Sequence, residues 1–164
     1  MEILIAIISL FVSIIALLMS LVFWIRQFRP IITACVRTVE SGNVAIAYSL
    51  KIMNSGSIPA KNIKIQINES DVQQSLGSGA SEKLKEMWLR SINKSIIYLL
   101  QNGDSASCSF GLTEENDLGF WRYGSEFPVL IIYEGWFGSK YKEKQLLKIQ
   151  DSDSFTHYKW SSPD

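Results

Sequence analysis

Residues 43–53 read NVAIAYSLKIM, and this stretch gives the hydrophobic period of the chain around it. Large apolar residues occur there at every second position, with small or polar residues between them. They are Val44, Ile46, Tyr48, Leu50 and Ile52. Successive side chains of a β-strand point to opposite faces of a sheet, so this pattern predicts a strand with one buried face.

The same period continues on both sides of this strand. Residues 54–59, NSGSIP, contain the asparagine, glycine and proline that are typical of turns. Further strands are expected over residues 31–40, 62–68, 95–100, 106–112, 127–133 and 141–149. The segment FPVLIIY at 127–133 is almost entirely apolar and suits the centre of a sheet, whereas the lysine-rich segment 141–149 suits a protected edge.

One segment, SEKLKEMWLR at 81–90, has a helical period. We expect Leu84, Met87 and Trp88 on its buried side and its charged residues, Lys85 among them, in solvent. A single short helix cannot supply the crossovers of an α/β fold. Six or seven short strands therefore predict an all-β fold, an immunoglobulin-like antiparallel β-sandwich over residues 30–150, with a helical insertion near 81–90 and a polar tail over 151–164.

Three segments resemble bacterial immunoglobulin-like domains of the cell-adhesion-related type. Residues 50–63, LKIMNSGSIPAKNI, are similar to the strand, turn and Pro-Ala corner of that family, residues 98–103, YLLQNG, to a later turn, and residues 132–141, IYEGWFGSKY, to the final hairpin. The family more often has Pro-Gly where this chain has Gln101-Asn102-Gly103. The resemblance covers residues 30–150 and implies an interaction or spacer module, here in a small membrane-anchored version.

The segment before residue 30 has a different character. Residues 3–25, ILIAIISLFVSIIALLMSLVFWI, carry no charge, and as a helix they would extend about 34 Å, slightly more than the hydrocarbon core of a bilayer. Residues 1–29 are therefore expected to form one transmembrane anchor. The start Met-Glu and the end Val-Phe-Trp-Ile-Arg favour a retained anchor over a cleaved signal peptide, which remains the alternative.

The arginines next to this segment predict its orientation. Arg26, Arg29 and Arg37 follow it closely, whereas Glu2 precedes it. Positive charges stay on the cytoplasmic side, so we expect a single-pass protein of the inner (cell) membrane with its N-terminus outside and its soluble domain in the cytoplasm. Trp24, Arg26 and Arg29 are expected at the membrane interface.

Small residues form a regular stripe within the anchor. Ala6, Ser9, Ser13, Ala16 and Ser20 are spaced three and four residues apart, which places them on one helix face. Such a face suits close packing against a second transmembrane helix. Alternatively, the serine hydroxyls simply bond back to the preceding turn.

The state of the two cysteines depends on the compartment in which the soluble domain lies. We expect Cys108 to point into the core, with Cys35 on an early strand. Both should be free thiols in the reducing cytoplasm, and a disulfide between them is the prediction of the opposite topology.

Composition argues against several functions. Sixteen basic residues balance sixteen acidic ones, so nothing favours nucleic-acid binding. The single histidine, His157, lies in the tail, and no metal-binding or cofactor-binding motif is present. We therefore expect no enzyme, no metal and no cofactor.

Aromatic residues are the best candidates for a partner-binding surface. Trp136 and Phe137 lie at a glycine-flanked hairpin tip, and Trp88 lies in the helical segment. They either anchor a partner or complete the core, with the tip folding back onto Trp121 and Tyr123.

These observations predict a membrane-tethered binding or scaffolding module, an accessory subunit of a larger system. Its expected partners are the lipid bilayer and another membrane or cytoplasmic protein, or a second copy through the transmembrane helix. The alternative is a membrane-active effector or toxin whose helices oligomerise and perturb the bilayer.

Overall fold

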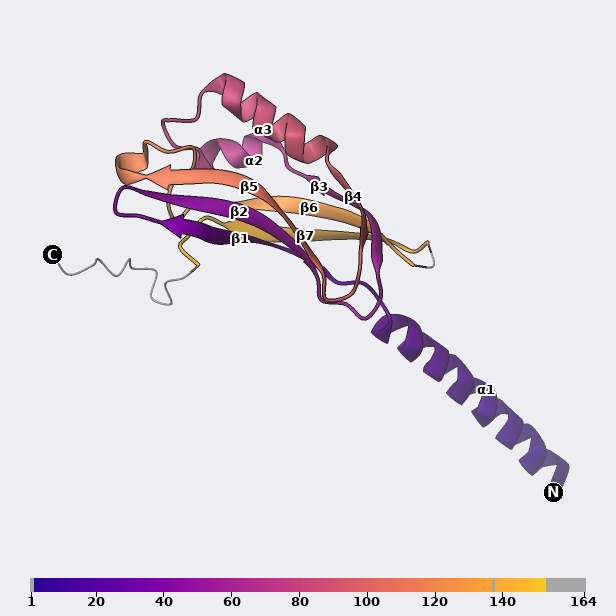
Figure 1. The fold of residues 1–164 in the computed structure, drawn as a ribbon. Coiled ribbons are helices and arrows are strands. Elements are labelled where there is room, and N and C mark those ends of the chain that lie inside the picture. Colours follow the sequence, from indigo (N-terminus) through magenta and orange to yellow (C-terminus); the bar gives the residue numbers. More distant parts are fainter. Residues whose placement is uncertain (1, 137, 153–164) are drawn as a thin grey trace.

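The computed structural model describes residues 2–136 and 138–152 of the 164-residue chain. A long helix, α1 (Glu2–Gln27), projects from one end of a β-rich body, and the N-terminus lies at its far end (Figure 1). The helix begins one residue before the apolar segment 3–25 and ends two residues after it. All its described residues are exposed, so the body buries none of them.

The body contains two antiparallel sheets packed face to face. One sheet has the order β1-β2-β5 and the other β4-β3-β6-β7. The strands are β1 (Ile32–Ser41), β2 (Ala45–Asn54), β3 (Ala60–Gln66), β4 (Ile96–Leu100), β5 (Ser105–Glu114), β6 (Glu126–Gly135) and β7 (Lys140–Lys148). The sequence predicted each of them to within a few residues.

The core lies between the two sheets, as the period of two requires. In β2, Ile46, Tyr48, Leu50 and Ile52 are all buried, whereas Val44 lies before the strand and is exposed. The apolar strand β6 is central in its sheet, and the lysine-bearing strand β7 is an edge.

The buried face predicted for residues 81–90 is right at Trp88, which packs against the core, and wrong at Leu84, Met87 and Lys85. Helix α3 (Glu82–Lys94) begins after Ser81, whose hydroxyl accepts a hydrogen bond from the Leu84 backbone N–H at 3.4 Å. Leu84 is 50% exposed and Met87 is 59% exposed, whereas Lys85 is buried. Buried positions 85, 89 and 92 follow the helical period, so the inward face is rotated from the expected one.

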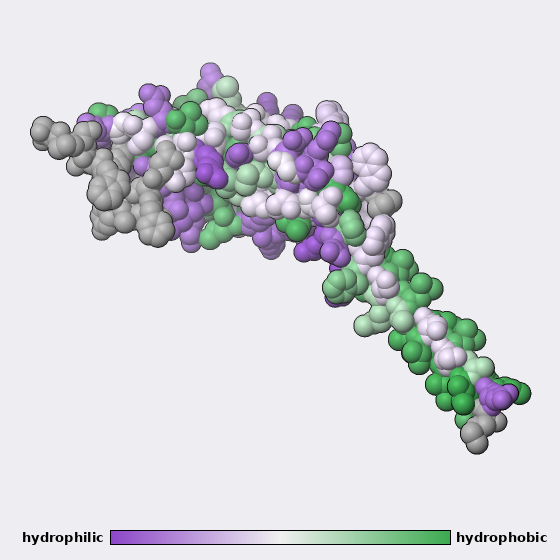
Figure 2. Space-filling model, turned by 60° about the horizontal axis from the view of Figure 1, so that its bottom comes forward, coloured by the Kyte–Doolittle hydropathy of each residue, from purple (hydrophilic) through white to green (hydrophobic). Residues whose placement is uncertain are grey.

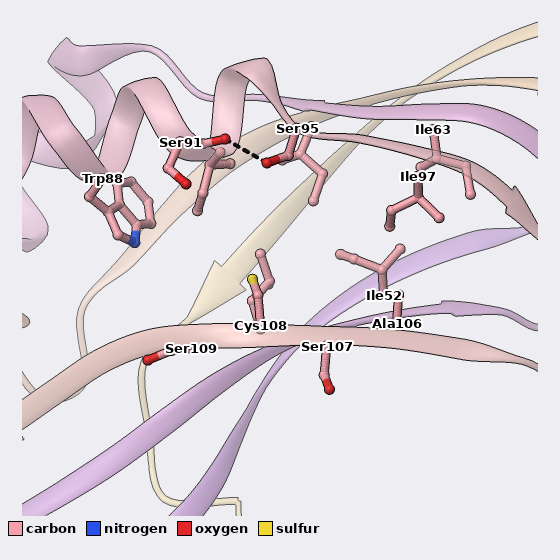
Figure 3. A pocket seen from close by; sticks show the side chains of 13 residues that line it. Ile52, Ile63, Trp88, Ser91, Ser95, Ile97, Ala106, Ser107, Cys108 and Ser109 are labelled. Carbon is pink, nitrogen blue, oxygen red and sulfur yellow. Dashed lines mark hydrogen bonds between the residues drawn. The ribbon is translucent and has the colours of Figure 1, made fainter.

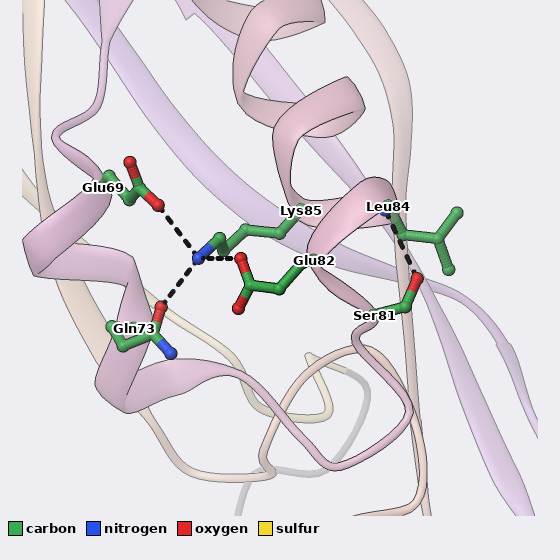
Figure 4. A network of polar contacts seen from close by, with 6 residues as sticks. All are labelled: Glu69, Gln73, Ser81, Glu82, Leu84 and Lys85. Atoms are coloured by element: carbon green, nitrogen blue, oxygen red, sulfur yellow. Dashed lines mark hydrogen bonds and ion pairs between the residues drawn. The ribbon is translucent and has the colours of Figure 1, made fainter.

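Lys85 is buried because a short segment that the sequence did not predict meets it. Helix α2 (Glu69–Val72) continues into the 3₁₀ turn η1 (Gln73–Ser75). The Lys85 ammonium lies 2.9 Å from Glu69, 2.6 Å from Glu82 and 3.1 Å from the amide oxygen of Gln73 (Figure 4). The aliphatic part of the side chain is covered, while the charge keeps three oxygen partners.

The first residues of the expected polar tail are part of the body. Asp151 is buried and accepts a hydrogen bond from the Thr38 hydroxyl at 2.9 Å. The Thr38 backbone N–H donates to the Ser152 hydroxyl at 2.9 Å. The rest of the tail, including His157, lies outside the described residues.

Strand directions divide the body into two ends. The β2–β3 loop, the β4–β5 loop and the β6–β7 turn lie beside α1, and we call this the helix-proximal end. The loops at 42–44, 67–81 and 115–125 lie at the distal end. This division decides which candidate residues can meet.

Candidate functional site

Helix α1 has the length and apolarity needed to cross a membrane. Its 26 residues carry charge only near the two ends, at Glu2 and Arg26. In Figure 2 its surface is mostly green, against the mixed purple and white of the body. Near its end the rings of Trp24 and Phe28 lie 5.2 Å apart, with Arg26 between them in sequence and Arg29 just beyond.

The serine stripe uses its hydroxyls within the helix. Ser9 Oγ donates to the Ala6 carbonyl at 2.9 Å, and Ser13 Oγ donates to the Ser9 carbonyl at 2.8 Å. Ala6, Ser9, Ser13, Ala16 and Ser20 are all exposed in the single chain, so the small-residue face is open to another helix.

The junction between α1 and the body is short and bonded. Ser57 in the β2–β3 loop donates through its hydroxyl to the Gln27 carbonyl at 3.0 Å and through its N–H to the Arg29 carbonyl at 3.3 Å. A Cβ at Gly56 would lie 2.4 Å from the Arg29 carbonyl oxygen, so this approach requires glycine. The helix therefore leads directly into the sheet domain.

Trp136 lies beside this junction at the helix-proximal end. Its side chain is 51% exposed, and the Lys61 ammonium lies 3.9 Å from its ring centroid. A small hollow of about 30 Å³ joins it to Trp24 and Phe28. Phe137, the other residue of the predicted tip, lies outside the described residues.

Trp136 does not lie against Trp121, so the structure does not support the alternative in which this tip folds back onto Trp121 and Tyr123. Strand β6 begins near Trp121 at the distal end and runs to Gly135 at the helix-proximal end. The full length of the strand therefore separates Trp136 from Trp121, which is completely buried.

Trp88 is half-buried beneath α3 and lies apart from Trp136. Its ring contacts four other aromatic rings, Phe110, Phe120, Trp121 and Phe127, with centroids 4.9–6.4 Å away. Gly111 lets this cluster form, because its φ of +99° suits glycine and a Cβ there would lie 3.0 Å from the Trp121 indole nitrogen. Trp88 and Trp136, the two predicted surface aromatics that the structure describes, thus do not form one patch.

Trp88 borders a cavity that the sequence did not predict. About 220 Å³ lies between the two sheets, under α3 and beside the edge strands β4 and β5. Ile52, Ile63 and Ile97 form part of its apolar wall, and Ala106 and Cys108 of β5 face them (Figure 3). The Trp88 indole nitrogen is buried and has no hydrogen-bond partner among the described residues.

The cysteines lie on opposite faces of the three-stranded sheet. Cys108 faces the other sheet, whereas Cys35 alternates with buried Ala34 and Val36 and faces outward. Strand β2 separates them, since Cys35 pairs with Lys51 and Cys108 with Leu50. Both are free, and this geometry excludes the disulfide whichever side of a membrane the body occupies.

Perturbed titratable groups are few and scattered. Burial raises the pKa of Tyr48 to about 12, and burial together with the Glu143 carboxylate raises the pKa of Tyr133. Burial also raises the pKa of the Cys108 thiol, which keeps it protonated. Within residues 2–136 and 138–152, no three histidine, cysteine or acidic residues could jointly hold a metal ion.

These features define a two-sheet β domain with an apolar N-terminal helix. The chain belongs to the family described as a domain of unknown function (DUF8453), which it matches over residues 2–153. No curated protein matches the chain.

Proposed function

We propose that this protein is a single-pass membrane-tethered binding or scaffolding module, an accessory subunit of a larger system. The observation that carries the proposal is α1, a helix of 26 residues in which no residue is buried. Burying so much apolar surface requires lipid or another apolar partner. Tethering would concentrate the body and its partners at one surface.

The arrangement of strands supports an immunoglobulin-like β-sandwich. The first, second and fifth strands share one sheet, and the third, fourth, sixth and seventh share the other. In an immunoglobulin-like domain the first, second and fifth strands likewise share one sheet, and the third, sixth and seventh share the other. Here β4, the strand after the third, belongs to the second sheet. Such domains commonly bind partners through loops at one end or through a sheet face.

A cytoplasmic body is the orientation that the flanking charges support. Arg26 and Arg29 lie at the junction, and Lys61 and Lys140 lie at the helix-proximal end of the body. These cations would meet the anionic headgroups of the inner leaflet, with Trp24 and Trp136 at interfacial depth.

Thiol labelling in intact bacterial cells tests both anchor and orientation. In a Cys35→Ser background Cys108 is the single, exposed thiol. A membrane-impermeant maleimide should label it only after the cells are permeabilised. A matched Glu2→Cys variant, also carrying Cys35→Ser and Cys108→Ser, should be labelled in intact cells. Labelling of Cys108 in intact cells, or a mature mass that lacks α1, would refute the proposal.

Partner binding is tested at the exposed tryptophan beside the membrane. Trp136→Ala should leave the melting temperature nearly unchanged, because half the side chain is in solvent, and should reduce cross-linking to a co-purified protein. Tyr98→Ala is the matched control, since Tyr98 is a more exposed aromatic on another strand. A large loss of stability in Trp136→Ala would instead assign this side chain to the core.

The alternative function, a membrane-active effector, depends on self-association of α1 through its small-residue stripe. Replacing Ser9, Ser13 and Ala16 with leucine should abolish oligomers if the stripe mediates association. Expression of the unmodified chain should leave the membrane potential intact if the protein is a scaffold. A collapse of the potential that the leucine variant prevents would favour the effector.

A further inference from the structure

The cavity between the two sheets is partly open to solvent, and Trp88 of α3 lies at one end of it. The sheets meet along β1 and β7, where the Gln145 side chain is hydrogen-bonded to the β1 backbone. The other two edge strands, β4 and β5, line the cavity together with α3. Cys108 of β5 is exposed to solvent, although its side chain faces the other sheet (Figure 3). The cavity can therefore be reached from solvent.

The cavity wall is mostly apolar, with four serines among its lining residues, and carries no charged side chain. Isoleucines from β2, β3, β4 and α3 line it, and none of its thirteen lining residues is Asp, Glu, Lys, Arg or His. The raised pKa of Cys108 follows from the same apolar surroundings. A charged ligand would lose its hydration there without gaining a counterion.

One end of the cavity carries an unused donor. The indole nitrogen of Trp88 is buried, finds no hydrogen-bond partner in the part of the chain that the structure describes, and points from α3 toward the space between the sheets. The Ser91 hydroxyl, three residues further along α3, points the same way (Figure 3). The four rings around Trp88 hold its orientation, so the ring cannot readily turn its N–H to solvent. Buried N–H groups normally have an acceptor, and this one has none among residues 2–136 and 138–152.

We propose that this cavity binds an uncharged apolar molecule that carries one hydrogen-bond acceptor, with the acceptor at Trp88 and the hydrocarbon among the isoleucines. An apolar cavity of about 150 Å³ accommodates benzene, so the 220 Å³ found here suits about nine non-hydrogen atoms. The inference does not depend on the membrane topology proposed above.

Three probes of similar length separate the parts of this proposal. 2-Octanone has nine non-hydrogen atoms and one carbonyl acceptor. 2-Methyl-1-octene has the same shape without the acceptor, and octanoate adds a negative charge. The full-length Cys35→Ser protein is held in lipid nanodiscs, and the rate of Cys108 alkylation is measured against the concentration of each probe.

The ketone should slow alkylation of Cys108 most strongly, because it fills the space beside the thiol and pairs with Trp88. The alkene should bind about fivefold to tenfold more weakly, the loss expected for one neutral hydrogen bond. Octanoate should be weaker than the ketone. Equal affinity for ketone and alkene would overturn the role of Trp88, and tighter binding of octanoate would overturn the requirement for an uncharged ligand.

Two neighbouring substitutions on β5 locate the binding site. Ala106 points into the cavity and Ser107 points away from it (Figure 3). Ala106→Phe should fill the cavity and remove the protection of Cys108 by the ketone, whereas Ser107→Phe should retain it. Both variants carry the same new ring in the same bilayer, so partitioning of the probe into lipid affects them equally. Protection that persists in Ala106→Phe, or no protection in the parent protein, would refute the proposal.

Trp88→Phe removes the donor while keeping an aromatic ring. Its affinity for 2-octanone should fall to that for 2-methyl-1-octene, while its affinity for the alkene stays unchanged. If the variant does not fold, the comparison of ketone and alkene in the parent protein decides the same point.

Discussion

The side-chain amide of Gln145 in β7 is hydrogen-bonded to the backbone of β1 at Ala34. The Ala34 N–H donates to Gln145 Oε1 at 2.9 Å, and Gln145 Nε2 donates to the carbonyl of neighbouring Ile32 at 2.6 Å. Both strands are sheet edges, so one amide takes the place of a strand neighbour and joins the two sheets. The opposite pair of edges, β4 and β5, borders the cavity instead.

Gln145→Glu should destabilise the fold by about 1–3 kcal/mol, because a carboxylate oxygen would face the Ile32 carbonyl in place of the amide donor. Gln145→Ala should cost less, since it introduces no repulsion. Thermal unfolding of the full chain in a non-ionic detergent measures both. Lys144→Ala, at an exposed neighbouring position, is the control and should change little. Stability of the glutamate variant equal to that of this control would contradict the bridging role.

Asn54 organises the helix-proximal end in a similar way. Its Oδ1 accepts from the N–H groups of Ile31 and Gly56, at 3.3 and 3.0 Å. Its Nδ2 donates to the carbonyls of Ile58 and Leu100, at 2.8 and 3.1 Å. The side chain is buried, and it links the start of β1, the β2–β3 loop and the end of β4.

Asn54→Asp should lower the unfolding free energy by about 3 kcal/mol. The Nδ2 group, which donates to the Ile58 and Leu100 carbonyls, would be replaced by an oxygen that faces them, and a negative charge would be buried. The measurement is again thermal unfolding of the full chain. Asn43→Asp makes the same chemical change at an exposed turn and should be nearly neutral. Similar losses in the two variants would show that the Asn54 contacts are not the cause.

Lys85 holds α2 against α3, and its removal should act locally. In Lys85→Met the carboxylates of Glu69 and Glu82 remain largely solvent-exposed, so no buried charge is left unpaired. Backbone amides over residues 69–76 should therefore exchange with solvent several-fold faster, with little change at β6. Hydrogen exchange measured by mass spectrometry resolves these segments. Lys83→Met, an exposed change on the same helix, should leave the pattern as it is, and uniform acceleration would contradict a local role.

The sequence predicted the strands well because their signal is local. In β2 the alternation of Ile46, Leu50 and Ile52 with small residues follows directly from the geometry of a pleated strand. The buried face of α3 was predicted correctly at Trp88 but wrongly at Lys85, because hydropathy assigns a lysine to solvent. Two of the partners of Lys85, Glu69 of α2 and Gln73 of η1, come from a segment whose four α-helical residues are too few to produce a recognisable period.

The cavity could not be predicted from the sequence for a different reason. Trp88, Ile97 and Cys108 come from three separate elements, and each alone is consistent with an ordinary core residue. These residues line one cavity only because β4 and β5, the edges of different sheets, lie on opposite sides of it. The spacing between two sheets leaves no periodic signal in the sequence. The position of Trp136 beside α1 likewise follows from the direction of β6 rather than from the composition of the hairpin tip.

Tyr48 gives the fold a defined sensitivity to alkaline pH. Its side chain is buried, and its hydroxyl lies 3.1 Å from the Thr113 hydroxyl. Burial raises the pKa of Tyr48 from 10.0 to about 12. Between these values the folded chain retains a proton that the unfolded chain has lost. The stabilisation is therefore complete below about pH 10 and is lost as the pH rises toward 12.

The unfolding free energy should accordingly fall above pH 10, by up to about 1.4 kcal/mol per pH unit for each such tyrosine. Tyr133 contributes with the same sign, because burial and the Glu143 carboxylate raise its pKa as well. Tyr48→Phe should remove one of these two contributions and make the decline shallower. Tyr98→Phe, at a largely exposed position, should follow the parent curve. Unfolding measured from pH 8 to pH 11.5 distinguishes these cases, and parallel curves for the parent and Tyr48→Phe would mean that Tyr48 ionises as readily in the folded chain as in the unfolded one.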